Sequence, residues 1–253
     1  MTKHTRDFYS DLAPLYHLIY EDWDASMSRQ ASMLNALIRS TWGDTVRSIL
    51  DLSCGIGTQA LGLARLGYEV TASDLSPEEV ERARTEAEQR NLTLSFSVAD
   101  MLNAFEHHRR QFDLVISCDN AVPHLLSDDE ILNAFRQMYA CTRPQGGCLI
   151  SVRDYAKECL EGRQFKPYGI RRENGIDYLV FQVWDFHGEI YDLSLYFVED
   201  KGGSACQTHV FRSQYYAIGI HRLIELMRQA GFTSVRRLDD QFFQPVIIGS
   251  RLA

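Results

Sequence analysis

The sequence predicts an α/β fold, a Rossmann-like, doubly wound, seven-stranded and mostly parallel sheet. Short apolar runs alternate with helical segments from residue 46 to residue 154, which is typical of parallel strands buried on both faces. The first run ends in an acid and a glycine loop, as a strand often does before a ligand-binding turn. Short alternating runs rich in aromatic residues then predict an inserted antiparallel β meander, before a last helix and two strands close the sheet.

Seven strand candidates follow one another along the chain. They cover residues 46–52, 69–74, 94–100, 112–118, 147–153, 233–238 and 246–250. Ser76, Pro77 and Glu79 form a capping box that starts one of the intervening helices, and residues 127–130 repeat the arrangement. The last helix, over residues 219–230, carries an apolar stripe and ends at Gly231. Such alternation implies right-handed crossovers and a ligand site outside the carboxyl ends of the strands.

The chain is predicted to be a single domain over residues 1–253, organised in four segments. Residues 1–40 form an amphipathic helical segment, and residues 41–154 form the central α/β core. Residues 155–216 are the β insertion, in which the runs 176–184 and 189–198 are separated by residues 186–188. Residues 217–253 return to the core with one helix and two strands.

Composition restricts the class of partner. A net charge of −8 and the absence of a basic cluster argue against nucleic acid and favour a small-molecule substrate. No apolar stretch approaches the roughly 20 residues that span a bilayer, and the N-terminus lacks the apolar core of a signal peptide. Six cysteines without a C-x-x-C pair predict reduced thiols and a cytoplasmic protein. No metal-ligand spacing is present, so we expect no metal.

The segment from Asp51 to Asp74 points to a nucleoside that carries an amino acid. Gly55 and Gly57 allow backbone N–H groups to approach a ligand at the start of a helix. Asp74 ends the next strand, where a carboxylate accepts hydrogen bonds from both ribose hydroxyls. Asp51 would repel a pyrophosphate but attract an α-amino group, and Ala60 replaces the third glycine of the dinucleotide pattern. These features fit S-adenosylmethionine.

The segment resembles the first motif and the acidic ribose loop of class I S-adenosylmethionine-dependent methyltransferases, which more often carry glycine at the position of Ser53. Within that superfamily, residues 120–125 and 152–155 resemble signatures of the glycine N-methyltransferase-like group. The resemblance implies an enzyme that uses S-adenosyl-L-methionine and releases S-adenosyl-L-homocysteine. Its acceptor would be a small molecule, first of all the amine nitrogen of an amino acid or related metabolite.

The same resemblance assigns further residues to the donor. Residues 1–40 would form a lid over the donor, with Tyr16 or Tyr20 covering it, and Leu75 would lie against the adenine ring. Asp100 and the backbone N–H of Met101 would bind the adenine. The carbonyl of Cys118 would accept from the methionyl amine, and Arg29 would bind the donor carboxylate.

Four residues are candidates for the acceptor site, over which the β insertion would fold. Asn120 and His124 resemble residues of the glycine-methylating group, and a histidine there could take a proton from an incoming ammonium. Arg153 follows an apolar strand and needs a partner, either a substrate carboxylate or Asp154. Tyr155 would line the same pocket.

Several alternatives stay open at this point. The acceptor atom could be the oxygen or carbon of a secondary metabolite, or the protein could bind the donor without catalysis. The Gly-x-Gly loop also occurs in NAD-binding enzymes, and Asp119, Asn120 and Asp154 could mimic the carboxylate cluster of magnesium-dependent catechol methylation. We expect a monomer or a homodimer.

Overall fold

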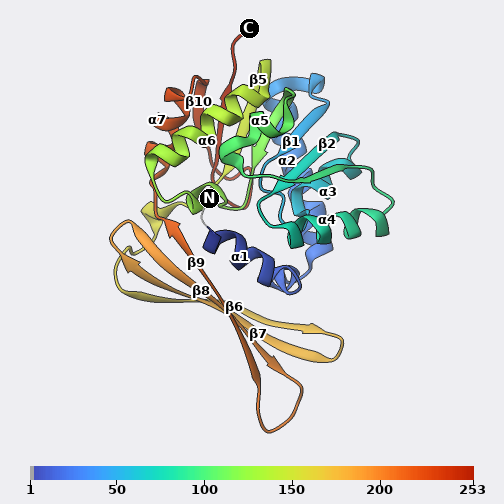
Figure 1. The fold of residues 1–253 in the computed structure, drawn as a ribbon, viewed down its shortest axis with the longest axis vertical. Helices are drawn as coiled ribbons and strands as arrows, with labels where there is room; N and C mark the ends of the chain where they lie inside the picture. Colours follow the sequence, from blue (N-terminus) through green and yellow to red (C-terminus); the bar gives the residue numbers. More distant parts are fainter. Residues whose placement is uncertain (1–2) are drawn as a thin grey trace.

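The computed structural model describes residues 3–253 and contains two sheets of different kinds. One is a seven-stranded, mostly parallel sheet between helices, and the other is a four-stranded antiparallel sheet. Helix α1 (Lys3–Leu12) lies between the α/β unit and the four-stranded sheet (Figure 1). The predicted fold class, with its inserted meander, is confirmed.

The seven strands have the order β10-β11-β5-β4-β1-β2-β3. Their bounds are Ser48–Asp51 for β1, Glu69–Asp74 for β2, Ser95–Val98 for β3, Phe112–Ser117 for β4, Thr142–Ser151 for β5, Thr233–Leu238 for β10 and Val246–Ser250 for β11. Only β11 runs antiparallel to its neighbours. Because β1 pairs with both β2 and β4, the strand order reverses beside β1, where open α/β sheets bind ligands.

Helices cover both faces of this sheet, as the alternating pattern requires. The main helices are α2 (Trp23–Trp42), α3 (Thr58–Arg65), α4 (Pro77–Gln89), α5 (Ala104–His108), α6 (Asp128–Cys141) and α7 (Ile220–Gln229). Apolar side chains of α5, α6 and α7 pack in one core cluster, and those of α2 and α3 pack in the cluster on the other face. Ser76 and Ser127 cap α4 and α6, as predicted, by accepting the N–H groups of Glu79 and Glu130.

The capping box at α4 forms only in part. The Ser76 N–H donates to Asp74 Oδ1 at 3.0 Å, so the Glu79 side chain does not return to it. Instead Glu79 is buried and points toward the cavity described below.

The end of β5 also differs from the prediction, which placed it at residue 153. The strand stops at Ser151, because the Arg153 N–H donates to Asn120 Oδ1 at 2.9 Å.

The inserted meander is larger than the sequence indicated. It contains β6 (Arg163–Glu173), β7 (Ile176–His187), β8 (Ile190–Asp200) and β9 (Gln207–Tyr216), paired in that order. The outer strands β6 and β9 were not predicted, because polar and charged residues hide their apolar alternation. The predicted turn at residues 186–188 is also wrong by two residues: Phe186 pairs with Tyr191 inside the sheet, where its ring is buried.

One face of the meander packs on the N-terminal helix. Buried side chains of β7 and β8, including Trp184, Tyr191 and Leu195, share a core cluster with Phe8 and Leu12 of α1. The chain then continues through a short 3-10 turn, Tyr16–Ile19, into α2. Residues from α1 and this turn therefore come close to both sheets, and they cover the edge where the ligand site is expected (Figure 1). Among residues 3–253, no helix combines the length and apolarity needed to span a membrane.

Candidate functional site

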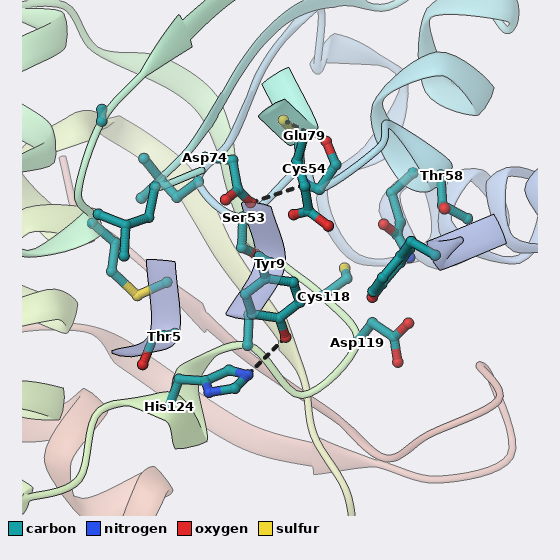
Figure 2. Close-up of a pocket in the computed structure, with 18 of the residues that line it drawn as sticks. Thr5, Tyr9, Ser53, Cys54, Thr58, Asp74, Glu79, Cys118, Asp119 and His124 are labelled. Carbon is teal, nitrogen blue, oxygen red and sulfur yellow. Dashed lines mark hydrogen bonds between the residues drawn. The ribbon is translucent and has the colours of Figure 1, made fainter. Parts of the chain in front are cut away.

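A cavity of about 600 Å³, mouth included, lies at the carboxyl ends of β1, β2 and β4 (Figure 2). Its lining comes from segments far apart in the sequence, which are the α1 helix, the 3-10 turn after it, the loop after β1, the start of α4 and the loop after β4. The lining residues used below are Tyr9, Tyr16, Tyr20, Ser53, Gly55, Thr58, Gln59, Asp74, Leu75, Glu79, Met101, Cys118, Asp119 and His124. This is the place at which the strand order predicts a nucleoside.

The loop after β1 needs glycine at two positions. Gly55 has φ +50° and Gly57 has φ +100°, and Gly57 is the N-cap of α3. A Cβ at Gly57 would meet the Leu61 side chain at 2.9 Å, and one at Gly55 would stand 3.4 Å from Glu79 Oε2. The backbone of this loop can therefore approach a ligand closely only while both positions remain without side chains.

Three buried carboxyl groups surround the loop. Asp74 accepts the Gly55 N–H at 2.9 Å and the Ser76 N–H at 3.0 Å. Asp51 accepts the Ser53 N–H at 3.2 Å, whereas its Oδ2 has no partner among the described residues; the same holds for Glu79 Oε1. Two buried acceptor atoms without donors indicate a ligand that brings hydroxyl or ammonium groups.

Burial also changes the protonation of these acids. It raises the pKa of Asp51 to about 7, and it raises the pKa of Asp74 less because the Ser76 and Gly55 N–H groups stabilise the carboxylate. Burial, followed by the charge of Asp74, raises the pKa of Glu79 well above its usual value. No lysine or arginine side chain lines the cavity within the described part of the chain. A cationic ligand would therefore stabilise the ionised forms of these acids without competition from a lysine or arginine side chain.

His124 lies on the opposite side of the cavity from Asp74 and contacts Tyr9 (Figure 2). The Tyr9 hydroxyl is 2.7 Å from His124 Nε2, and Ser213 Oγ is 3.3 Å from Nδ1. The imidazole is 1% exposed, and burial lowers its pKa to about 3. His124 is therefore a neutral ring held by two hydroxyl groups, which makes it a weaker proton acceptor than an ordinary histidine.

A second cavity of about 480 Å³ adjoins the first and is roofed by the meander. Residues from β6 to β9 line it, together with Asn120, Arg153 and the α1 residues Phe8, Tyr9 and Leu12. Tyr9, Tyr16 and Asp119 line both cavities. These three residues mark the junction between the two sites.

Arg153 is the basic group of the second cavity. Its Nη1 donates to the Tyr191 hydroxyl at 3.2 Å, and its guanidinium lies 4.3 Å from the Trp184 ring centroid. Asp154, considered above as its partner, instead pairs with Arg237 at 2.6 Å and with Lys157 at 3.8 Å. With this acid engaged elsewhere, Arg153 has no carboxylate within ion-pair distance among residues 3–253, and its remaining donors are available to an anionic group.

The structure brings most of the predicted donor residues together. Tyr20, Ser53, Gly55, Asp74, Leu75, Met101 and Cys118 line the first cavity, and Asp51 and Gly57 support its loop. Asp100 caps the 3-10 turn Met101–Asn103 by accepting the Leu102 N–H at 2.9 Å. Arg29 is not among the lining residues of this cavity: it is exposed on α2 and donates to Ser26 Oγ, and its carboxylate-binding role stays a prediction.

The predicted acceptor residues divide between the two cavities. Asn120 and Arg153 line the second cavity, whereas His124 lines the first. Tyr155 is buried behind this lining, and its hydroxyl accepts from Asn120 Nδ2 at 3.0 Å. Asn120 thereby connects the turn after β4 with the loop after β5. This arrangement braces the two loops beside the second cavity.

Sequence reasoning missed several lining residues. Tyr9 was not assigned to the site, Glu79 was interpreted as a helix-capping residue, and Asp119 only as part of a metal cluster. No group of three or more potential metal ligands occurs among the described residues, so the magnesium alternative has no structural support. The meander residues Phe181 and Tyr196 stack on each other, with ring centroids 4.7 Å apart, and line neither cavity.

Comparisons with known proteins agree with this geometry. A family model described as a methyltransferase domain matches residues 49–146. Residues 49–146, which run from β1 into β5, are thus similar to a methyltransferase domain. The solved structure of DesVI from Streptomyces venezuelae has a TM-score of 0.81 at 18% identity, over 97% of this chain and 98% of that one. CalS10, described as an amino pentose methyltransferase from Micromonospora echinaspora, has a TM-score of 0.77 at 18% identity, over 89% and 92% of the two chains.

Sequence relatives of this methyltransferase domain include more than one class. A glycine/sarcosine N-methyltransferase of Parasynechococcus marenigrum is 28% identical over 141 residues, which are 56% of this chain and 49% of the relative. A ubiquinone biosynthesis O-methyltransferase of Roseobacter denitrificans is 37% identical over 92 residues, 36% of each chain. The chain thus spans about half or less of the length of these relatives.

Proposed function

We propose that this protein is an enzyme that transfers the methyl group of S-adenosyl-L-methionine to the amine nitrogen of a small molecule. The observation that carries the proposal is the pair of adjoining cavities. The first has acids and a glycine loop without any basic side chain among its described lining, and the second contains Arg153. Tyr9, Tyr16 and Asp119 stand where the two ligands would meet.

The residues of the first cavity fit the donor. Asp74 would accept from the ribose hydroxyls, and Leu75, Asp100 and Met101 would hold the adenine. The unpartnered Oδ2 of Asp51 and the carbonyl of Cys118 would accept from the methionyl ammonium. At the α2 and α3 side of the cavity, the Thr58 hydroxyl and the second amide N–H of Gln59, whose first is donated to Gln30, would donate to the carboxylate. When bound, the donor supplies an activated methyl group, and the protein supplies alignment and exclusion of water.

The second cavity supports an acceptor that bears both an amine and an anionic or strongly polar group. Arg153 would hold that group, since its nearest carboxyl neighbour in the sequence is already paired with Arg237. A glycine/sarcosine N-methyltransferase among the relatives and an amino pentose methyltransferase among the structural neighbours both support nitrogen as the acceptor atom. An amino acid and an amino sugar are both consistent with this pocket chemistry.

The ubiquinone-pathway O-methyltransferase among the relatives keeps an oxygen acceptor as the second candidate. A carbon acceptor, or donor binding without turnover, is the remaining alternative. We further propose a cytoplasmic monomer or homodimer that does not bind nucleic acid. Four buried free cysteines and the net charge of −8 support this part of the proposal, and light scattering in solution distinguishes the two assembly states.

The test is S-adenosyl-L-homocysteine release from labelled donor across a panel of acceptors, with donor binding measured by calorimetry. The panel contains glycine, sarcosine, other amino acids, amino sugars, biogenic amines and phenols. Turnover on amines that carry a carboxylate or sugar hydroxyls would support the proposal. Turnover restricted to phenols would replace nitrogen by oxygen, and donor binding without any turnover would favour a binding protein. Failure to bind the donor would contradict the proposed function as a whole.

A further inference from the structure

Asp119 occupies the one position where a carboxylate lines both cavities among the residues that the structure describes. The other acids of the first cavity, Asp74 and Glu79, lie across it from Asp119, which stands beside Cys118 (Figure 2). The second cavity has no other acidic residue in its described lining. A group placed between the two ligands is therefore next to Asp119.

The backbone holds Asp119 in an uncommon conformation. Asp119 has φ +59° and Asn120 has φ +64°, two consecutive non-glycine residues in the left-handed region. Each such residue costs about 1–3 kcal/mol and persists only where its surroundings enforce it. Ser151 provides that enforcement, because its Oγ accepts the Asp119 N–H at 2.8 Å and its carbonyl accepts the Asn120 N–H at 3.0 Å. Strain of this kind is concentrated where a side chain must be aimed at a site.

The carboxylate of Asp119 has hydrogen bonds but no counter-ion. Oδ2 accepts from the Tyr20 hydroxyl at 3.1 Å and Oδ1 from Gln244 Nε2 at 3.3 Å. No ion pair to Asp119 exists within the described chain. The groups that interact electrostatically with it are Tyr16, Tyr20, Cys118, Arg153, Tyr168 and Tyr215. Burial raises the pKa of Asp119, while Tyr20 and Arg153 act in the opposite direction.

His124 is less suited to the same position. Both of its ring nitrogens already face hydroxyl groups, and protonation would place a charge in a fully buried site. It lines only the first cavity. Its geometry fits a positioning residue that fixes the Tyr9 hydroxyl at the junction.

From this placement we infer that Asp119 binds the ammonium form of the acceptor at the junction and takes its proton. This inference rests on the proposed function. The acceptor R–NH₃⁺ transfers one proton to an Asp119 carboxylate oxygen and becomes R–NH₂. The nitrogen lone pair then forms the N–C bond to the methyl carbon, while the C–S bond breaks and its electron pair stays on sulfur. The proton leaves Asp119 for solvent as the products depart.

The experiment uses a donor analogue, so that it does not depend on knowing the acceptor. Sinefungin carries a primary ammonium where the donor carries its S-methyl group, whereas S-adenosyl-L-homocysteine carries neither. Binding of both to the full-length protein and to Asp119→Asn is measured by calorimetry at pH 7.5. We expect the variant to bind sinefungin at least tenfold more weakly and S-adenosyl-L-homocysteine within threefold of wild type.

Two outcomes would overturn the inference. An equal loss for both ligands would assign Asp119 to the methionyl part of the donor, and unchanged affinity for both would show that it does not face the transferred methyl group. Asp154→Asn is the matched control, because that acid is paired with Arg237 outside both cavities and its loss should leave both affinities unchanged. If wild type binds neither ligand, the proposed function fails instead.

The proton transfer has its own test. With an amine that wild type methylates, Asp119→Asn should lower kcat about 100-fold while the donor Kd stays within threefold, in the range of a lost general base. An unchanged kcat at saturating acceptor would refute the proton-acceptor role and leave Asp119 only a binding group.

Discussion

The buried carboxyl group of Asp51 makes a quantitative prediction about the ligand-free protein. Its side chain is 0% exposed, and its Oδ2 has no partner among the described residues. Burial raises its pKa from 3.8 to about 7, against the stabilising Ser53 N–H and in the same direction as the charge of Asp74. At any pH between 3.8 and about 7, the folded protein therefore keeps a proton on Asp51 that the unfolded chain has already lost. The free energy of unfolding must fall as pH rises through this window, and it becomes constant above it.

The perturbation is Asp51→Asn, which keeps the shape of the side chain and removes its charge. Each pH unit inside the window costs wild type about 1.4 kcal/mol. Between pH 5 and pH 8 the window covers about two units, so wild type loses about 3 kcal/mol that the variant retains. The unpaired amide N–H of the variant adds about 1–3 kcal/mol of destabilisation. That term is the same at both pH values and cancels in the comparison.

The assay is urea unfolding of wild type and Asp51→Asn at pH 5 and pH 8, without ligand. The stability of the variant relative to wild type should improve by about 3 kcal/mol at the higher pH, equivalent to about 6–12 °C in Tm for a chain of this size. Asp44→Asn is the control, because Asp44 is an exposed acid whose side chain is 71% accessible. A relative stability that stays the same at both pH values would refute the reasoning.

Three further predictions test the loop, the second cavity and the buried histidine. Gly57→Ala should lower the free energy of unfolding by about 1–3 kcal/mol more than the control Gly43→Ala does. Both glycines have positive φ, but only at Gly57 would an added Cβ meet a side chain, at 2.9 Å. Equal losses for the two variants in denaturant unfolding would show that this contact is unimportant. In steady-state kinetics, Arg153→Ala should raise the acceptor KM at least tenfold and the donor KM less than threefold. The acceptor KM of Arg153→Lys should lie between those of wild type and Arg153→Ala. Equal effects on the two KM values would indicate a structural arginine. Burial lowers the pKa of His124 from 6.5 to about 3, so the folded state binds fewer protons at this site, and the contribution of His124 to the free energy of unfolding should fall by about 2 kcal/mol between pH 6.5 and pH 5. His124→Asn should not show that loss, and parallel stability curves for the two proteins would contradict the assignment.

Local signals were sufficient for much of the donor site. The glycines at 55 and 57 are required by backbone conformation, and Asp74 follows from its position at the end of a strand next to the first. Arg29 shows where this reasoning stops: the arginine assigned by resemblance to the donor carboxylate lies on the exposed side of α2, outside the lining of the first cavity. Helix orientation depends on which stripe packs against α3, and a motif match does not contain that information.

The same limit applies to Glu79. Its spacing from Ser76 is that of a capping box, yet Asp74 takes the Ser76 N–H and Glu79 turns into the cavity. The competing acceptor is local, because Asp74 precedes Ser76 by only two residues. The cavity into which Glu79 turns, in contrast, is formed by the tertiary structure. The strands β6 and β9 were missed for a related reason. The polar residues on one side of each strand become compatible with a sheet only when β7 and β8 supply the pairing.

The amino-acid sequence by itself determined the α/β framework, the meander and the donor loop. Strand and helix periodicities and the steric freedom of glycine act over a few residues, so they can be recognised without knowing the fold. Only the tertiary structure decided how the reaction centre is composed. Tyr9 reaches His124 across 115 positions and Tyr20 reaches Asp119 across 99, and these contacts exist because the meander and the sheet both pack against the N-terminal segment. The resulting burial sets the protonation of Asp51, His124 and Asp119, a property that no side chain has before the chain folds.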